Sequence, residues 1–468
     1  DARLTQVDEV TLRGELDRSI DERVWQSYDS AVHCNGNGAC YNFDPNDAMC
    51  PSWKATRNRI HSPKGRASLI REWLRLQGLH GANVLQSAGG NLFQRARNSL
   101  ARRMGRDDFS HEVYDAMAGC LACKSCAGQC PVKVNVPEFR ARFLQLYHGR
   151  YLRPLKDYLI GSLEFSIPYL ARFPRAYNAV MSFAPVQQAL QRVAGMVDSP
   201  LLSLVDFQAH CRDWNVRAAT ADRLARLTPE QRQRSVILVQ DAFTRYFDTP
   251  VMADWLELIS RLGFDIYLAP FAANGKPLQV QGFLGAFDKA ARYNAQSLRQ
   301  LQASGIALVG LDPAMTLVYR QEYAKTLGHD QAPTVLLPQE WLAQVLPQTG
   351  EPGTGGVYQL LPHCTEKTNE PNSITHWQQV FSRLGATLQV LASGCCGMSG
   401  TYGHEARNVA TSKVIYGQSW QPLLARYQSS GNLLADGYSC RSQVKREEGH
   451  TVRHPLQALL EHVRKNTV

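Results

Sequence analysis

The chain has 468 residues, enough for about three domains of roughly 150 residues each. Hydrophobic residues make up 44% and charged residues 20%, a balance typical of globular proteins that excludes a largely disordered chain. Lysine and arginine total 51 against 41 acidic residues, so the net charge of +10 permits an acidic partner. We expect no nucleic-acid partner, because no basic motif interleaved with aromatic residues accompanies this charge.

The sequence has no run of apolar residues near the roughly 18–20 that a membrane-spanning helix needs. It begins at Asp1 without an initiator methionine or an apolar signal region, which suggests a fragment or an internal boundary of a longer chain. The 12 cysteines lie mostly in short-spaced clusters, which favour metal ligands over the disulfides of small secreted proteins. We therefore expect a reducing, cytoplasmic compartment.

Helical patterns dominate the first 230 residues, with helices expected over 9–25, 63–79, 109–117 and 138–151. From residue 234, short β-rich runs alternate with helical stretches, which indicates parallel α/β structure. The expected strands are 236–239, 264–268, 306–309, 357–361, 387–391 and 433–434.

An internal repeat lies in this second part of the chain. The sequence SRLG at 260–263 recurs at 382–385, and Trp255 has Trp377 as its counterpart at the same offset of 122 residues. Residues 234–323 and 356–463 therefore look like two copies of one unit. The first copy is expected to be a scaffold without ligands, because it lacks the cysteines of the second. Ala242, Ala273 and Asn274 stand opposite Cys364, Cys395 and Cys396 at this offset, and Ala314 stands opposite Cys440 after a four-residue shift.

The strongest motif is Cys120-x2-Cys123-x2-Cys126-x3-Cys130-Pro131. Three cysteines at two-residue intervals bind three corners of a cubane cluster, whereas the fourth, before proline, usually ligates a different cluster. Cys50 has the same Cys–Pro ending and is the natural remaining donor. The sequence thus predicts a [4Fe–4S] cluster on Cys50, Cys120, Cys123 and Cys126. A zinc site is the alternative, but it typically needs two separated cysteine pairs.

Cys34, Cys40 and Cys130 remain as candidates for a second cluster. A [4Fe–4S] cluster has four ligands, and only these three cysteines remain. A second cluster here would therefore need a non-thiolate ligand such as His33 or Asp44, or would be a three-iron form. The alternative is that Cys34 and Cys40 are packing residues or bind one further ion.

A third cysteine set follows predicted strands of the second copy, at the carboxyl edge of a parallel sheet where α/β sites form. Gly394 and Gly397 allow the tight backbone by which adjacent cysteines face one metal. Four thiolates suit zinc, iron or a cluster. Buried free thiols or a redox disulfide are the alternatives. The predicted ligands are Cys364, Cys395, Cys396 and Cys440, with His363 and His404 as further candidates.

Basic groups beside the Cys50 loop are candidates for contact with a carboxylate substrate or a flavin, namely Arg57, His61 and Arg66. A solvated face or packing of the cysteine loop explains them equally well. The arginines between 95 and 106 form a second basic run, which fits a solvated helix face or docking to an acidic domain or anionic lipid.

The cysteine motifs resemble those of the iron–sulfur subunits of glycolate oxidase, anaerobic glycerol-3-phosphate dehydrogenase and heterodisulfide reductase. Residues 34–67, CNGNGACYNFDPNDAMCPSWKATRNRIHSPKGRA, more closely resemble fused bacterial FAD-linked oxidases such as the D-2-hydroxyglutarate dehydrogenases. The resemblance implies the C-terminal iron–sulfur half of such an oxidase, with its CCG domains, and FAD on an N-terminal half. The chain departs from the family pattern in two places. Between Cys34 and Cys50 it lacks one cysteine of the two-cluster pattern. The last cysteine pair of the family is reduced to Cys440 with Gln443, which is compatible with a mononuclear metal.

The resemblance also implies a function. A flavin oxidises D-2-hydroxyglutarate to 2-oxoglutarate and passes electrons one at a time through [4Fe–4S] to a quinone or another redox protein. It implies a FAD-binding domain in the same longer chain or in a separate polypeptide, a homo-oligomer, and peripheral contact with the inner membrane. The alternatives are the iron–sulfur component of a D-lactate or glycolate dehydrogenase, a heterodisulfide-reductase-type subunit, and a zinc-binding interaction module.

The predicted fold class is α plus α/β, an all-helical ferredoxin-like [4Fe–4S] domain followed by two repeated CCG-type α/β units. The predicted domains are 1–150 for the iron–sulfur region, 151–233 for a helical linker, 234–350 for the repeat without cysteines, and 351–468 for the repeat with the metal or cluster site.

Overall fold

The computed structural model of the chain describes residues 11–86, 89–106, 108–347, 356–427 and 431–466. The chain divides into two compact units. The first, the helical unit, contains the described residues up to Asp44 together with Met49–Pro154 and Val280–Leu284. The second, the sheet unit, contains Pro45–Ala48, Leu155–Gln279 and the described residues from Gly285 onward. The finer division into four domains stays a prediction.

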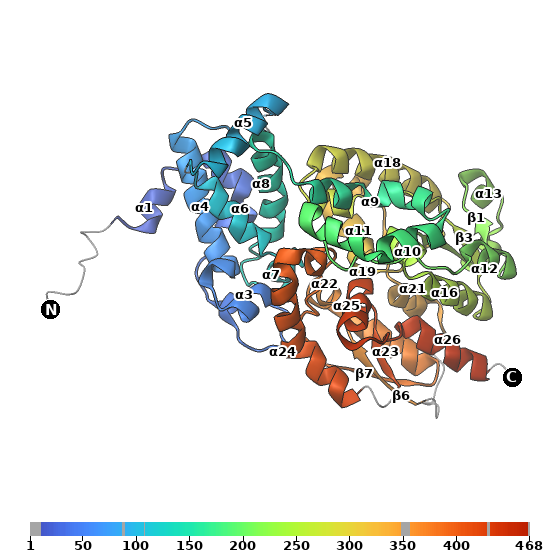
Figure 1. Cartoon of the computed structure of the whole chain (residues 1–468). Helices are drawn as coiled ribbons and strands as arrows, with labels where there is room; N and C mark the ends of the chain where they lie inside the picture. The colour runs from blue at the N-terminus through green and yellow to red at the C-terminus, as the bar shows by residue number, and fades with distance from the viewer. Residues whose placement is uncertain (1–10, 87–88, 107, 348–355, 428–430, 467–468) are drawn as a thin grey trace. The chain divides into compact units, whose positions relative to one another are not determined.

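Helices alone build the described part of the helical unit (Figure 1). Three of the predicted helices are confirmed, but the predicted helix over 9–25 is interrupted, because the Asp21 side chain accepts a hydrogen bond from the Arg23 amide and starts a new helix. The helices are α1 (Arg13–Asp17), α2 (Glu22–Val32), α3 (Pro51–Thr56), α4 (Pro63–Leu79), α5 (Leu92–Arg103), α6 (Ser110–Ala118), α7 (Ser125–Gln129) and α8 (Val136–Arg150).

The longest of these helices, α4, begins where the sequence predicts and anchors the core of the unit. Ser62 caps it by accepting the Gly65 amide, and a proline follows at its first position. In the core, the Trp73 ring meets the rings of Phe139 and Phe143 edge-on, with centroids 5.8 and 5.2 Å away. These contacts hold α4 against α8, the two helices that flank the cysteine loops.

The sheet unit contains two parallel sheets. Five strands follow the order β1-β3-β2-β4-β5, and three follow the order β7-β6-β8. All predicted strands are confirmed to within two residues, whereas β1 and β5, each two residues long at a sheet edge, escaped prediction. The strands are β1 (Arg217–Ala218), β2 (Ser235–Val239), β3 (Asp265–Leu268), β4 (Leu308–Gly310), β5 (Val335–Leu336), β6 (Val357–Leu361), β7 (Thr387–Val390) and β8 (Leu433–Ala435).

The remaining helices surround these sheets (Figure 1). They are α9 (Leu155–Leu170), α10 (Pro174–Ser182), α11 (Ala184–Ala189), α12 (Phe207–Asp213), α13 (Ala221–Ala225), α14 (Pro229–Gln233), α15 (Ala242–Tyr246), α16 (Thr249–Arg261), α17 (Lys276–Val280), α18 (Leu284–Gln302), α19 (Pro313–Val318), α20 (Ala324–Leu327), α21 (Pro338–Val345), α22 (Cys364–Asn369), α23 (Pro371–Arg383), α24 (Val409–Tyr427), α25 (Tyr438–Glu448) and α26 (Pro455–Asn466). None of the described helices is long and apolar enough to cross a membrane.

The internal repeat is confirmed. β2 and β6 start at 235 and 357, α16 and α23 at 249 and 371, and β3 and β7 at 265 and 387, all at the predicted offset. Trp255 and Trp377 are each 1% exposed in one shared hydrophobic core. Gly263 and Gly385 both have a left-handed backbone, with φ of 84° and 81°, which explains why the turn after each SRL sequence uses glycine.

Candidate iron–sulfur and thiol sites

The loop from Cys120 to Cys130 folds back on itself through unusual backbone angles. Ala122 and Lys124, on either side of Cys123, have φ of 56° and 60°, and Cys50 has φ of 36° at the start of α3. Residues other than glycine rarely adopt this left-handed conformation, and they do so mainly at functional sites where the surrounding structure enforces it. The backbone strain is therefore concentrated at the predicted cluster ligands.

The four predicted cluster ligands, Cys50, Cys120, Cys123 and Cys126, line one small pocket of the helical unit. Among the described residues, no group of three or more His, Cys, Asp or Glu side chains closes around a single metal ion. A cubane is larger than one ion and is held by four thiolates around it, and these four cysteines line one pocket. The soft sulfur donors and their common pocket therefore fit a [4Fe–4S] cluster.

Electrostatics in this pocket also favour a positively charged occupant. Burial raises the pKa of Cys126 well above its usual value, and the neighbouring Cys120 and Cys123 raise it further. Burial likewise raises the pKa of Cys50, against the opposing charge of Arg66. Four thiolates cannot share this space without a cation, because their mutual repulsion and desolvation favour the protonated form. Iron would supply that charge.

Arg66 lies inside the unit and is 2% exposed, and its contact with a substrate or flavin stays a prediction. Its guanidinium donates to the carbonyl of Ala116 at 3.1 Å and to Ser52 Oγ at 3.2 Å, and its Nη1 lies 3.9 Å from Cys50 Sγ. Arg66 is thus a permanent positive charge beside a predicted cluster ligand. The sequence marked it as basic but could not reveal that it is buried.

The two other basic candidates lie nearby. His61 Nδ1 is 2.9 Å from Thr56 Oγ1, and burial, with the charge of Arg66, lowers the pKa of His61 below its usual value. The Arg57 guanidinium lies over the Phe43 ring, 4.4 Å from its centroid. Contact of these side chains with a substrate or flavin stays a prediction.

The second cysteine set is also brought together. Burial raises the pKa of Cys40, and its neighbours Cys34 and Cys130 add to this effect. His33, one of the two proposed non-thiolate ligands beside Asp44, faces the carbonyls of Asp29 and Val132 with its two ring nitrogens. The three thiols therefore lie close together, whereas both ring nitrogens of His33 face backbone carbonyls.

The third cysteine set forms a chain of contacts at the carboxyl edge of the three-stranded sheet. Cys395 donates hydrogen bonds to Cys364 and Cys396, and Cys440 donates to Cys396. All four side chains are at most 6% exposed. The structure thus assembles the predicted set from α22, the loop after β7, and α25.

Glycines make this close approach possible. Gly397 has φ of 88°, and a Cβ there would lie 2.4 Å from the carbonyl oxygen of Ser412. A Cβ at Gly437 would lie 2.4 Å from the His363 ring and 3.2 Å from Cys440 Sγ. The predicted need for glycine at 397 is confirmed, whereas Gly437 escaped the sequence analysis because it stands outside the Cys–Cys–Gly motif.

Along the thiol chain the pKa values are alternately lowered, at Cys364 and Cys396, and raised, at Cys395 and Cys440. The hydrogen bond from Cys395 lowers the pKa of Cys364 to about 7, and similar bonds from Cys395 and Cys440 lower that of Cys396 well below its usual value. Burial lowers the pKa of His363, but the surrounding anions, Cys364 first, outweigh it and raise that pKa. Among the described residues, His363 Nδ1 has no hydrogen-bond partner. Thiols and imidazole are the donor types that zinc prefers, but the described side chains of this set do not close around one ion.

His404, the other candidate ligand, faces the carbonyl of Val197 at 3.3 Å. Burial and Arg446 lower its pKa to about 4, so it stays neutral near pH 7.

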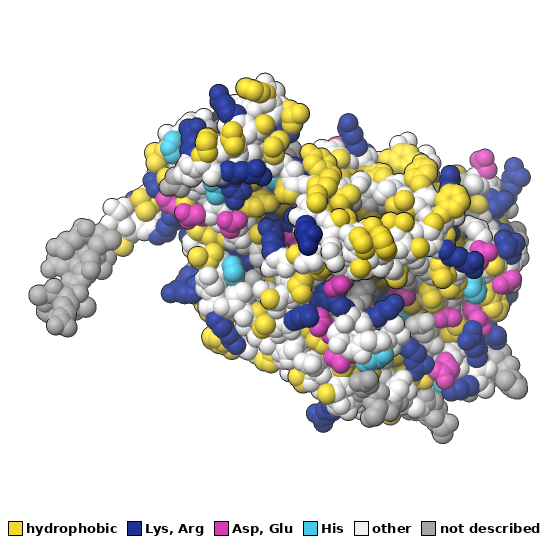
Figure 2. Space-filling model, viewed as in Figure 1, with side chains coloured by type: hydrophobic (Ala, Val, Ile, Leu, Met, Phe, Trp, Pro, Cys, Tyr) yellow, Lys and Arg dark blue, Asp and Glu magenta, His cyan; other side chains and the backbone are white. Residues whose placement is uncertain are grey.

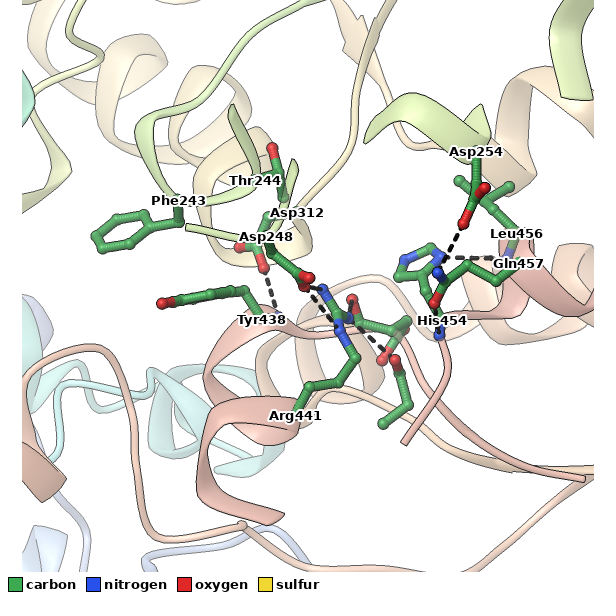
Figure 3. Close-up of polar contacts among 12 residues, drawn as sticks. Phe243, Thr244, Asp248, Asp254, Asp312, Tyr438, Arg441, His454, Leu456 and Gln457 are labelled. Atoms are coloured by element: carbon green, nitrogen blue, oxygen red, sulfur yellow. Dashed lines mark hydrogen bonds and ion pairs between the residues drawn. The ribbon is translucent and has the colours of Figure 1, made fainter. Parts of the chain in front are cut away.

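A polar network fixes the helix that carries Cys440 (Figure 3). Arg441 pairs with Asp248 at 2.6 Å, and the backbone amide of Tyr438 donates to Asp312 Oδ2 at 2.9 Å. Because Asp248 and Asp312 belong to the first copy of the repeat, this copy positions the thiol-bearing helix of the second. The first copy is therefore a structural support for the thiol site.

In the first copy, alanines and an asparagine stand opposite the thiols, and acidic side chains lie beside them. Asp241 caps α15 and takes the place of His363, and burial together with Asp312 raises its pKa to about 6. Asn274, opposite Cys396, donates through its side chain to the carbonyl of Met315 at 3.0 Å. The predicted loss of the cysteine ligand set is thus accompanied by a different, oxygen-rich network.

Comparison with known proteins places these sites in context. Residues 30–134 match the family model of the 4Fe-4S dicluster domain, which includes all seven cysteines of the helical unit. D-2-hydroxyglutarate dehydrogenase of Pseudomonas putida is 63% identical over 99% of this chain and 46% of its own length. The enzyme of the same name from Escherichia coli K12 is 47% identical over 98% of the chain and 46% of its own length.

A more distant relative is one of the subunits of the anaerobic glycerol-3-phosphate dehydrogenase of Escherichia coli K12, 24% identical over 65% of this chain and 76% of its own length. No solved structure matches the chain.

The assignment of the chain to the C-terminal half of a fused oxidase is corrected by these comparisons. The match to the Pseudomonas putida dehydrogenase takes in 99% of this chain, so its whole length, and not one part of it, is similar to such enzymes. The chain spans about half the length of the curated dehydrogenases that it matches.

Proposed function

We propose that the chain takes part in the FAD-linked oxidation of D-2-hydroxyglutarate to 2-oxoglutarate, and that it carries electrons from the flavin to an acceptor. The observation that carries this proposal is the pocket lined by Cys50, Cys120, Cys123 and Cys126, within a region similar to a 4Fe-4S dicluster domain. The relatives named D-2-hydroxyglutarate dehydrogenase support the choice of substrate.

A [4Fe–4S] cluster in this pocket would supply one-electron redox chemistry, which divides a two-electron oxidation into single steps. The four cysteines would hold it, with Cys50 and Cys126 buried and Cys120 and Cys123 half-buried. Arg66, close to Cys50, offsets negative charge and so favours the reduced state. These residues set how readily the site accepts an electron.

Cys34, Cys40 and Cys130 bind a second cluster in this proposal, completed by a ligand other than His33. The chain of Cys364, Cys395, Cys396 and Cys440 binds zinc or iron, with His363 as an additional donor. Replacing Cys395 by serine should remove this metal, measured by elemental analysis, and leave the cluster absorbance unchanged. An unchanged metal content would contradict the assignment.

The proposal assigns FAD to a binding domain in a longer chain or in a separate polypeptide. The acceptor is a quinone or another redox protein. The assembled enzyme is a cytoplasmic homo-oligomer, with peripheral contact to the inner membrane.

The test uses anaerobically purified protein together with its flavin-binding partner. Adding D-2-hydroxyglutarate should bleach the visible cluster absorbance, whereas L-2-hydroxyglutarate should not. Material that is free of iron and sulfide, or clusters that respond only to dithionite, would overturn the proposal. D-lactate and glycolate are tested in the same way. If either bleached the cluster absorbance faster than D-2-hydroxyglutarate, that acid would be the preferred substrate.

A further inference from the structure

A cavity of about 700 Å³ opens in the first copy of the repeat, within the size range of small-molecule sites. Phe271, Ala272 and Ala273 form one wall, directly after β3, while α9 and α18 form the others. Ala273 is the counterpart of Cys395 in the second copy. The cavity therefore lies at the carboxyl edge of a parallel sheet, where α/β folds place their ligands.

Aromatic and small side chains shape the cavity for a flat ring. Phe165, Tyr169, Phe271 and Tyr293 supply aromatic surface, and the small residues leave room between them. Tyr169 and Tyr293 are 66% and 70% exposed, so these large rings lie open to the solvent. A planar ligand would gain stacking and apolar contact on entering. The small lining residues are Ala272, Ala273, Ala286 and Ala290.

The helix α9 has apolar side chains on both its exposed and its buried face. Its buried face also holds charged groups, including Glu164 at 2% exposed, and its exposed face is apolar. Figure 2 shows apolar side chains gathered on the surface in this part of the sheet unit. The exposed apolar residues of α9 are Leu155, Tyr158, Leu159, Phe165, Tyr169 and Leu170.

Glu164 is the one carboxyl group among the residues that line the cavity. It accepts the backbone amides of Asn274 at 3.2 Å and Gly275 at 2.8 Å, which fix its position. Burial raises its pKa to about 7, although these two amides oppose the shift. Near neutral pH the carboxyl can therefore donate a proton to a ligand oxygen or accept one from it.

Two cations, Arg172 and Lys289, also line the cavity. They suit polar or anionic substituents of a ligand whose ring is seated among the aromatic side chains.

Building on the proposed function, we propose that this cavity binds the ring of a quinone, the electron acceptor, with the Glu164 carboxyl hydrogen-bonded to a ring oxygen. The first copy, which lost the thiols, is then an acceptor-binding unit as well as a support. An amino-acid or sugar ligand fits less well, since it would leave the four aromatic rings without a matching surface.

The test measures binding of 2-methyl-1,4-naphthoquinone to the purified protein through quenching of its intrinsic fluorescence. Ala290→Trp places a bulky ring in the lining of the cavity and should weaken binding at least tenfold. Gln296→Trp places the same side chain on an exposed position of α18 outside the lining and should bind as wild type. Equal binding by wild type and Ala290→Trp would overturn the proposal.

A second variant tests the carboxyl group. Binding of the oxidised quinone should tighten as the pH falls through about 7, because protonated Glu164 donates to the ring carbonyl, and Glu164→Gln should flatten this dependence. The other titratable groups around Glu164 are Asp241, Tyr319 and Tyr323, with Arg172 and Lys289 also in the cavity lining. A pH dependence unchanged in Glu164→Gln would contradict the role of this carboxyl.

Vesicles distinguish a soluble quinone from a membrane pool. Phosphatidylcholine vesicles with and without a long-tailed quinone are compared for reoxidation of dithionite-reduced protein. Loss of this reoxidation in Ala290→Trp supports a membrane quinone in the cavity, and retention overturns it. Bleaching of the clusters by D-2-hydroxyglutarate should persist in Ala290→Trp, so failure of the quinone site and failure of the proposed dehydrogenase function are separable.

Discussion

At the scale of single residues, charge and burial decide what each cysteine can do. Cys126 and Cys50 have raised pKa values in a crowded pocket, whereas Cys364 and Cys396 have lowered ones in a chain of hydrogen bonds. The first pair needs an external positive charge to ionise, and the second is already close to ionisation. Spacing alone predicts both sets as ligands, but only the three-dimensional surroundings separate their chemistry.

Cys123→Ser should remove the proposed [4Fe–4S] cluster, because serine oxygen is a poor substitute for thiolate toward iron. We expect a loss of about four iron atoms per chain and of the visible absorbance. Cys211→Ser provides the control, since this lone cysteine lies in the core of the sheet unit. Full iron content in Cys123→Ser would refute the ligand assignment.

Arg66→Met should lower the reduction potential of the cluster, because the reduced cluster carries one more negative charge and loses a nearby cation. We expect a shift of about 59 mV, equivalent to a tenfold change in a one-electron equilibrium. Redox titration followed by electron paramagnetic resonance measures it. Arg66→Lys keeps the charge, so an equal shift in both variants would point to packing instead.

Acid should destabilise the fold through His404. Its folded pKa of about 4 lies below the ordinary value of 6.5, so the unfolded chain takes up the proton first as the pH falls. This contribution is fully present above pH 6.5 and is lost toward pH 4, by at most about 3 kcal/mol. His404→Asn should show a smaller fall in melting temperature between pH 7 and 5, and the exposed His80→Asn should behave as wild type.

At the scale of elements, periodicity predicts what is long and regular. Helix α4 begins and ends as its apolar spacing indicates, and the repeat predicts the relation of α16 to α23. The edge strands β1 and β5 were missed because two residues are too few to show the alternation of apolar and polar side chains that indicates a strand. Glu164 was also missed. A single acidic residue in an apolar helix is expected to face the solvent, but in the structure this side of α9 is buried.

Gly437→Ala should displace α25 from the thiol site, since the new Cβ would overlap the His363 ring. We expect loss of the proposed metal and a destabilisation of about 1–3 kcal/mol, measured by elemental analysis and thermal unfolding. Gly417→Ala is the matched control within α24, where the nearest atom is the flexible end of Gln421 at 3.4 Å. That variant should be neutral or slightly more stable, because alanine favours helices.

At the scale of the whole molecule, the sequence predicts the order of a helical cysteine-rich part and a repeated α/β part. It does not predict that Pro45–Ala48 belongs to the sheet unit, or that Val280–Leu284 belongs to the helical unit. Such exchanges of short segments arise from packing between distant residues, which local patterns do not record. Resemblance to fused oxidases suggested a C-terminal half, whereas the comparisons show similarity along the entire chain.

The segment Val280–Leu284 has a consequence for biosynthesis. Arg153 donates to the carbonyl of Gly282 at 3.2 Å, and a Cβ on Gly282 would lie 2.6 Å from that of Leu144, so the segment packs tightly into the helical unit. A nascent chain emerging from the ribosome would thus present every cysteine of this unit well before the last piece of their surroundings. The proposed iron assembly would then have to wait for residue 284, or begin on an unfinished scaffold.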